Sequence, residues 1–393
     1  MVDVYDPLSP QAHEDPYPLY RVLREEYPLY HVERHGVWAL SRYIDVRDAL
    51  RDWETFTSAR GVEIGDYVQF FGEGSIQELD PPHHDTLRRV IAPRFVAKNI
   101  KFMESTVRDI AEGLIDGFAD SPQVDLAAQF TAALPIATIF ALLGVPDSDS
   151  PWAMERGLTM LRRPAEESGP SLAAMQARAE LVAYLEEGVR ERRGSGPLAG
   201  SDDVLGDIAA AIDAGVMSEQ EIQGLTLLLI AAGMETTSGL MGNIAYALAT
   251  GDVSADQLID PSTKEVSVTA MEEFLRHDSP AQWLARVTTR PVTLHGTELP
   301  PGSRVLVLFA SANRDPRAFD RPDERILDRQ ESRHMSFGEG VHFCLGRPLA
   351  RLETRVGMTA LMRRIPAFTA AGAPARYPSH VIRGFESIPV TIG

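Results

Sequence analysis

The 393-residue sequence predicts a mainly α-helical protein with small β-sheets. Apolar residues recur at helical spacing through most of the middle of the chain, as in Leu181, Tyr184 and Leu185. Alternating polar and apolar runs are short, and they lie far apart in the sequence. This pattern is typical of a helical body whose sheets are formed by distant segments.

The expected strands are short segments set off by glycine and proline, which end extended structure. One lies near the start of the chain, two follow residue 286, and one is at the end. Their expected ranges are 36–41, 292–294, 304–309 and 389–392. The segment 163–170, RPAEESGP, is expected to be an exposed loop between helices.

One helix is expected to be much longer than the others. Ser218 and Glu221 have the spacing of a capping box, and no proline interrupts the chain from there to Thr250 and Gly251. A helix of about 30 residues is roughly 45 Å long at ~1.5 Å per residue. Because its apolar residues lie on nearly all faces, we expect it to be buried through the core.

Composition limits the location and partners of the protein. No linker-like stretch divides the chain, so 1–393 is expected to be one domain. The apolar stretches 225–234 and 132–145 are shorter than the ~20 residues of a membrane span, and the N-terminus lacks a basic signal region. The net charge of −18 argues against binding to nucleic acid or anionic lipid. We expect a cytoplasmic monomer that contacts neither nucleic acid nor membrane.

The only cysteine, Cys344, lies in the glycine-rich run FGEGVHFCLG, which spans 337–346. A helix reading RPLARLETRVGMTALMRR follows directly, so its first amide groups would point at the sulfur and stabilise a thiolate. A single cysteine excludes intrachain disulfides and zinc sites built from several thiolates. The alternative interpretation is a buried structural cysteine beside a turn.

The middle of the long helix reads AGMETT over 232–237. Its small residues share a face at spacings of three and four, and Thr236 and Glu235 offer a hydroxyl and a carboxylate for moving protons. A threonine within a helix is otherwise commonly bonded back to its own backbone.

The run F-G-x-G-x-H-x-C-x-G resembles the haem-binding signature of the cytochrome P450 family, and the likeness extends across nearly the whole chain. It implies a P450 fold in which haem b lies between the long distal helix and the proximal loop and helix that carry Cys344. In this likeness Cys344 is the axial ligand of the iron, and Thr236 and Glu235 deliver protons. The glutamate stands where many family members have aspartate. The other implied haem contacts are Phe337, Gly338, Gly346, Ala232 and Gly233.

The resemblance also assigns charged residues. Haem carries two propionates, which require cationic donors when buried. By motif these donors are His84, Arg88, Arg286 and His342, while His83 is expected at the surface. Glu273, Arg276 and Arg329 resemble the family's buried network, which holds the cysteine loop and is structural.

Substrate contacts are implied in a variable loop, the distal helix, the turn after the E-x-x-R helix and the C-terminal turn. These residues would form a largely apolar pocket, although each could equally be ordinary core. They are Tyr67, Phe70, Leu229, Met234, Gln282, Leu284 and Phe385.

The implied function is a monooxygenase that inserts one atom of O2 into an organic substrate by hydroxylation or O-demethylation. Stretches such as FTSARGVEIGDY are similar to the subfamily that oxidises para-substituted aromatic acids. A polyketide, terpenoid or other natural product is the competing substrate, and a non-catalytic haem sensor or carrier is the competing class. Electrons would come from NAD(P)H through a ferredoxin reductase and a ferredoxin. Arg347, Arg351 and Arg355, with Arg89 or Lys98, would form a basic patch for the ferredoxin.

Overall fold

The computed structural model describes residues 4–65, 71–161, 171–194, 198–330 and 333–393. Contacts between Cα atoms divide the chain into two compact units, each assembled from separate segments. Unit 1 comprises Met1–Val68, Ser267–Cys344 and Ser379–Gly384, and unit 2 comprises Gln69–Val266, Leu345–Pro378 and Phe385–Gly393. The expectation of one domain stays a prediction, and the expected loop at 163–170 lies outside the described residues.

Unit 1 is built on a five-stranded sheet with the order β1-β2-β8-β5-β3. The pair β2–β8 is parallel, with Val37 opposite Arg304, and the other pairs are antiparallel. Two strands from separate segments of the unit, β2 and β8, are thus neighbours at the centre of the sheet. The strands are β1 (Leu29–Val32), β2 (Val37–Leu40), β3 (Phe56–Thr57), β5 (Leu284–Thr288) and β8 (Arg304–Val307).

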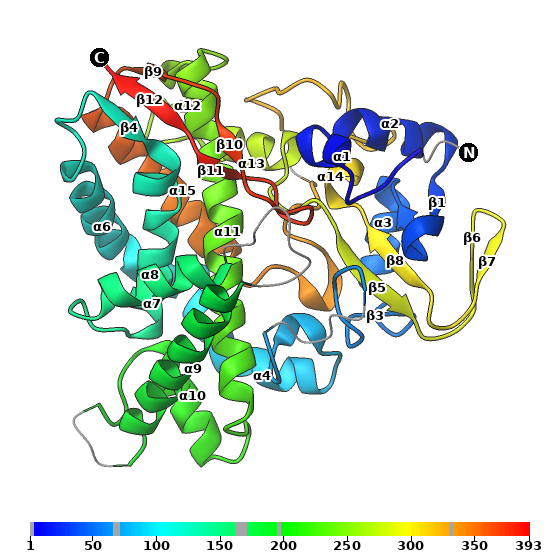
Figure 1. The fold of residues 1–393 in the computed structure, drawn as a ribbon, viewed down its shortest axis with the longest axis horizontal. Coiled ribbons are helices and arrows are strands. Elements are labelled where there is room, and N and C mark those ends of the chain that lie inside the picture. Colours follow the sequence, from blue (N-terminus) through cyan, green and yellow to red (C-terminus); the bar gives the residue numbers. More distant parts are fainter. Residues whose placement is uncertain (1–3, 66–70, 162–170, 195–197, 331–332) are drawn as a thin grey trace. The chain divides into compact units, whose positions relative to one another are not determined.

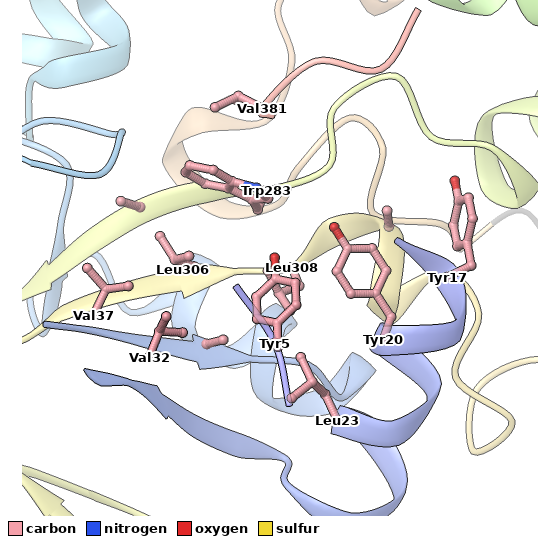
Figure 2. Close-up of a cluster of buried hydrophobic side chains, with 13 residues drawn as sticks. Tyr5, Tyr17, Tyr20, Leu23, Val32, Val37, Trp283, Leu306, Leu308 and Val381 are labelled. Atoms are coloured by element: carbon pink, nitrogen blue, oxygen red, sulfur yellow. The ribbon is translucent and has the colours of Figure 1, made fainter. Parts of the chain in front are cut away.

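Both faces of this sheet are buried, as the alternation of side chains along β8 shows. Leu306 packs into one apolar cluster, whereas its neighbours Val305 and Val307 pack into another. The first cluster includes Tyr20 and Trp283 and is drawn in Figure 2. The helices of unit 1 are α1 (Pro10–Glu14), α2 (Tyr17–Glu26), α3 (Tyr43–Arg51), α13 (Val268–His277) and α14 (Phe309–Ala312), with 3-10 turns η1 (Glu33–His35) and η6 (Gly340–His342).

A hairpin of β6 (Val292–Leu294) and β7 (Thr297–Leu299) completes unit 1. Its two-residue turn, His295 and Gly296, has φ values of 49° and 78°. Two consecutive positive φ angles match the right-handed twist of the flanking strands. The strands expected at 36–41 and 292–294 are confirmed, while β8 ends before Phe309 because α14 begins there.

Unit 2 is a set of helices around α11 (Glu221–Thr250), the longest helix in Figure 1. It is long and apolar enough to cross a membrane by length and composition, but 78% of its apolar window is buried inside the protein. That burial is typical of a core helix. The others are α4 (His83–Ile91), α5 (Ala97–Ile100), α6 (Glu104–Asp116), α7 (Ala133–Leu143), α8 (Ser150–Leu161), α9 (Leu172–Arg192), α10 (Val204–Asp213), α12 (Ala255–Leu258) and α15 (Arg347–Arg364).

The start of α11 differs from the sequence prediction. The backbone N–H and the hydroxyl of Ser218 donate to the Glu221 carboxylate at 2.7 and 2.9 Å, and the helix begins only at Glu221. The carboxylate closes a turn ahead of the helix, so Ser218 is not the N-cap residue. The predicted end at Thr250 is confirmed, with Gly251 in the left-handed conformation at φ 77°.

Small sheets complete unit 2. The first has the antiparallel order β4-β12-β9, and the second pairs β10 with β11. The strands are β4 (Gln123–Asp125), β9 (Phe368–Ala370), β10 (Ala375–Arg376), β11 (Phe385–Ser387) and β12 (Pro389–Ile392), the last as predicted; the remaining turns are η2 (Ile76–Glu78), η3 (Ala92–Phe95), η4 (Lys101–Met103) and the π-helical η5 (Ala127–Thr131). The fold is thus mainly helical with small sheets, as the sequence predicts.

Candidate functional site

The loop that carries the cysteine belongs to unit 1 and is closed by its own backbone. Cys344 N–H donates to the Phe337 carbonyl at 2.8 Å. Gly340 has a φ of +70°, and a Cβ there would lie 2.4 Å from the Leu50 carbonyl oxygen. Only glycine therefore fits where the loop meets α3. Cys344 itself is half-buried, and α15 begins at Arg347, shortly after it in the chain.

The other predicted residues of this loop are also half-buried. They are Phe337 and Gly338 in unit 1, and Gly346, which is the N-cap residue of α15 in unit 2. The helix bounds coincide with those expected from the sequence.

The structure brings the three predicted network residues together in unit 1. Both nitrogens of the Arg276 fork, Nε and Nη2, donate to Glu273 at 2.8 Å, and Arg329 Nε donates to the same carboxylate at 3.0 Å. Burial opposes ionisation of Glu273, but hydrogen bonds from Arg276 and the Ile326 N–H outweigh it and lower the pKa of this carboxyl. A carboxylate that accepts a bidentate pair of hydrogen bonds in this way holds the arginine side chains in fixed positions relative to helix α13.

A second buried pair lies beside this network and was missed in the sequence. His334 Nε2 and Glu272 Oε2 are 3.1 Å apart, with side chains 2% and 9% exposed. The only local signal was the doubled glutamate of MEEFLRH, because the partner is 62 residues away.

The four predicted propionate donors divide between the units. His84 and Arg88 lie on α4 in unit 2, whereas Arg286 on β5 and His342 on η6 lie in unit 1. His84 and Arg286 are buried, and His342 Nε2 is 3.0 Å from the Ser58 hydroxyl. Burial lowers the pKa of His84, and the charge of Arg88 adds to this effect, while the hydrogen bond with Asp85 opposes it. His83 is half-exposed, as expected, and lies 2.5 Å from Glu221.

The middle of α11 is open where most of the helix is buried. Ala232 is exposed, and Gly233, Glu235 and Thr236 are half-buried. The Thr236 hydroxyl donates to the Ala232 carbonyl at 2.9 Å, which leaves its oxygen lone pairs available as acceptors. A Cβ at Gly233 would lie 3.3 Å from the Ile139 side chain, so this glycine also permits close packing of α7 on α11.

Glu235 lies within electrostatic reach of a phenol and a hydroxyl that sequence reasoning missed. The Tyr377 and Ser238 hydroxyls are 3.0 Å apart. Burial raises the pKa of Tyr377 to about 12; the hydrogen bond with Ser238 opposes this rise, and the negative charge of Glu235 adds to it. The charge of Glu235 thus acts on a phenol that stays protonated at neutral pH.

A buried acid packs against the same segment of α11. Glu353 on α15 hydrogen-bonds with Thr237 on α11 and Thr138 on α7. Burial raises the pKa of Glu353 well above its ordinary value of 4.5, and the two threonines only partly oppose this. Burial therefore favours the protonated form of this carboxyl. No motif in the sequence indicated it.

Four of the seven predicted substrate contacts are buried, and their role stays a prediction. Leu229, Met234 and Phe385 are buried in unit 2, and Phe385 packs on Tyr246 with ring centroids 5.0 Å apart. The buried Gln282 amide accepts from the Tyr20 hydroxyl at 3.2 Å and donates to the Ser279 carbonyl at 2.6 Å. This bonding favours a structural role for Gln282. Leu284 is half-buried, and Tyr67 and Phe70 lie outside the described residues.

The expected arginine patch on α15 is reduced by ion pairing. Arg355 Nη2 donates to Glu104 at 2.8 Å, and Arg355 Nη1 pairs with Glu265. Because two carboxylates offset its charge, Arg355 does not belong to an open basic surface. Arg347 and Arg351 are half-buried.

Comparison with known proteins identifies close likenesses over the whole chain. Residues 266–369 match the family model described as Cytochrome P450. The sequence is 35% identical to Putative cytochrome P450 123 of Mycobacterium tuberculosis, over 99% of this chain and 97% of that protein. It is 32% identical to the Cytochrome P450 monooxygenase PikC of Streptomyces venezuelae, over 96% and 91%. The solved structure of the Bacillus subtilis bacillaene polyketide synthase cytochrome P450 PksS superposes with a TM-score of 0.86 at 29% identity, covering 99% of this chain and 100% of that one.

Proposed function

The chain belongs to the cytochrome P450 family of monooxygenases, which hold haem b through a cysteine thiolate, and we propose that Cys344 supplies this thiolate. One observation carries the proposal. The single cysteine of the sequence lies in a loop that is closed by its own backbone and has room only for glycine at Gly340. The Cys344 N–H donates a hydrogen bond to the Phe337 carbonyl, which fixes the loop backbone at the cysteine.

The proposed donors have the chemistry that haem b requires. Two propionates require cationic or hydrogen-bonding partners away from water, and His84 and Arg286 are buried groups of that kind. Arg88 and the half-buried His342 would add to them, with Ser58 fixing the orientation of the His342 ring. Phe337, Gly338 and Gly346 would line the cysteine side, and Ala232 and Gly233 the α11 side.

When bound, haem supplies the activation of O2, so that one oxygen atom enters the substrate and the other leaves as water. The protein must then supply protons where water is otherwise kept out. Thr236 lies on the open strip of α11 and can accept a hydrogen bond while its own hydrogen is held by Ala232. Glu235 would deliver protons to this position, and its charge acts on Tyr377, whose hydroxyl is hydrogen-bonded to that of Ser238.

For the substrate, we propose a natural product such as a polyketide or terpenoid, or alternatively a para-substituted aromatic acid. The name of one relative supports the first class, because PksS of Bacillus subtilis, which is 30% identical over 99% of this chain, is described as a polyketide biosynthesis cytochrome P450. The short stretches similar to aromatic-acid oxidases support the second. A panel of both classes, scored by the shift of the Soret band on binding, distinguishes them.

For electron supply, we propose a ferredoxin with an NAD(P)H-dependent reductase, docking on a basic surface of unit 2. The sequence has three lysines, and two of them, Lys98 and Lys101, lie next to Phe102, whose side chain is 75% exposed. We call Val96, Lys98, Lys101 and Phe102 the lysine patch. Its charge complements an acidic ferredoxin, while the net charge of −18 would repel that partner elsewhere.

The test of the ligand assignment is the carbon monoxide difference spectrum of the reduced, haem-loaded protein. Wild-type protein is expected to show the Soret band of a thiolate-ligated haem, and Cys344→Ser is expected to lose it. A wild-type spectrum without that band in folded, haem-replete protein contradicts the assignment. Retention of the band in Cys344→Ser does so equally.

A further inference from the structure

The Glu272–His334 pair is buried in unit 1, at the start of the loop that leads to Cys344. His334 Nδ1 accepts a hydrogen bond from the Ser336 N–H at 3.3 Å. A ring nitrogen that accepts carries no proton, so in the neutral ring Nε2 is protonated and donates to Glu272. One imidazole thus connects helix α13 to the loop backbone.

The two residues that follow His334, Met335 and Ser336, are hydrogen-bonded to α13 and to Asn313. The Ser336 hydroxyl donates to the Leu275 carbonyl of α13 at 2.7 Å. The Asn313 side chain bonds both neighbours, accepting from the Met335 N–H at 2.5 Å and donating to the Ser336 hydroxyl at 2.9 Å. Residues 334–336 are therefore each held by side-chain hydrogen bonds, although the described residues 333–339 form neither helix nor strand.

Backbone hydrogen bonds connect residues 334–336 to the cysteine. Gly338 N–H donates to the Met335 carbonyl at 2.8 Å, and Cys344 N–H donates to the Phe337 carbonyl at 2.8 Å. The His334 and Phe337 rings are also in contact, with centroids 5.6 Å apart. A shift of His334 would thus be passed along bonded segments to Cys344.

The pair is distinct from the Glu273 network in its partners. Glu273 is shared by two arginines, Arg276 and Arg329, whereas the Glu272 carboxylate pairs with the His334 ring. The two arginines donate to backbone carbonyls within residues 320–324, whereas His334 lies in the segment that leads directly into the cysteine loop.

We infer that His334 is a positioning residue that, through its hydrogen bond to Glu272, holds the loop on α13 and so fixes where Cys344 presents its sulfur. The inference rests on the proposed function, in which Cys344 is the thiolate ligand. It assigns His334 no contact with substrate or with the reacting atoms.

The experiment compares His334→Phe with His334→Gln in haem-loaded protein. Phenylalanine keeps a ring beside Phe337 but donates no hydrogen bond, whereas glutamine keeps a donor. The readout is the rate at which the thiolate-type Soret band of the reduced carbon monoxide complex is lost, at temperatures where far-UV circular dichroism remains native. We expect loss to be roughly tenfold faster or more in His334→Phe, because the buried Glu272 carboxyl group loses this hydrogen bond, and near wild type in His334→Gln.

A matched control separates positioning from general destabilisation. Arg192→Met breaks a buried ion pair in unit 2, where Arg192 Nε bonds Asp203 at 2.8 Å. It should lower the melting temperature while leaving the decay of the band unchanged below melting. If His334→Phe does not fold, Ser336→Ala removes the bond to Leu275 and is expected to accelerate the decay to a smaller degree.

Two results overturn the inference separately. If band loss in the His334 or Ser336 variants merely follows the fall in melting temperature, as in Arg192→Met, the residue is structural only. If wild-type protein itself lacks the thiolate-type band, the assignment of Cys344 fails, and the inference falls with it.

Discussion

Thr236 is a single hydroxyl on the open strip of α11, and its role depends on that position. We expect Thr236→Ala to lower the product formed per NAD(P)H by roughly tenfold or more and to release hydrogen peroxide, because proton delivery is lost while electron supply continues. Product and peroxide are measured together in one reconstituted assay.

Thr236→Ser is the matched control, since it keeps the hydroxyl that bonds Ala232 and loses only a methyl group. Its coupling should stay near wild type. Unchanged coupling in Thr236→Ala would remove this residue from proton delivery.

At the residue scale, the sequence could indicate only those groups that belong to a local motif. Cys344 and Thr236 stand in recognisable runs of residues. Glu353, Tyr377 and His334 do not, because their partners are distant in the chain and their importance arises from burial alone. A residue whose chemistry is created by tertiary packing leaves little trace in its neighbours.

The segment before α4 is held on α11 by glycine. The Gly224 N–H donates to the Glu73 carbonyl at 3.0 Å, and a Cβ at Gly224 would lie 2.1 Å from that oxygen. We therefore expect Gly224→Ala to displace this segment and destabilise the protein by about 1–3 kcal/mol. Thermal melting and limited proteolysis around residue 73 measure the two effects.

Gly113→Ala is the matched control within a helix. Gly113 lies inside the exposed face of α6, and a Cβ there would meet nothing within 4 Å. This substitution should stabilise the protein by about 0.5–1 kcal/mol, as alanine does inside helices. Equal effects of the two substitutions would show that the contact with Glu73 is unimportant.

The lysine patch is a surface element whose charge can be reversed. The double variant Lys98→Glu and Lys101→Glu should slow reduction by ferredoxin on the order of tenfold, because an attractive surface becomes repulsive. Stopped-flow absorbance of the haem measures this rate. Lys264→Glu changes the remaining lysine, which is also exposed, and should leave the rate close to wild type. A similar loss in Lys264→Glu would point to net charge rather than to a docking surface.

Helices and strands could be predicted where a continuous stretch of sequence defines them by its own pattern. The bounds of α15 and β12 agree with the prediction, because a continuous periodic run or flanking turns define them. The strand β3 has two residues and exists through its pairing with β5, more than 200 residues later, so no local pattern could reveal it. The start of α11 was misplaced because the Glu221 side chain closes a turn ahead of the helix.

At the scale of the whole molecule, Glu353 links stability to pH. Folding raises its pKa, so its contribution to the free energy of unfolding is complete below the ordinary value of 4.5 and is lost as pH rises through the folded-state pKa. As the pH rises above about 5, wild-type protein should therefore lose stability relative to Glu353→Gln, by up to about 1.4 kcal/mol per pH unit until the folded-state pKa is passed.

Melting temperatures of the two proteins across this range test the linkage. Glu386→Gln, which changes an exposed carboxylate, should give a curve parallel to that of wild type. Parallel curves for wild type and Glu353→Gln would mean that Glu353 is already ionised in the folded protein.

The burial of charged groups determines how strongly ionic strength affects each of them. The Glu272–His334 and Glu273–Arg276 pairs are buried, whereas Lys98 and Lys101 are exposed. Mobile ions screen exposed charges over about 8 Å at physiological ionic strength but act much less on buried pairs. Added electrolyte should therefore slow the arrival of electrons from an acidic partner at concentrations that leave the Cys344 loop in place. The ionic composition around this protein would then set its rate of turnover without altering the geometry of the Cys344 loop.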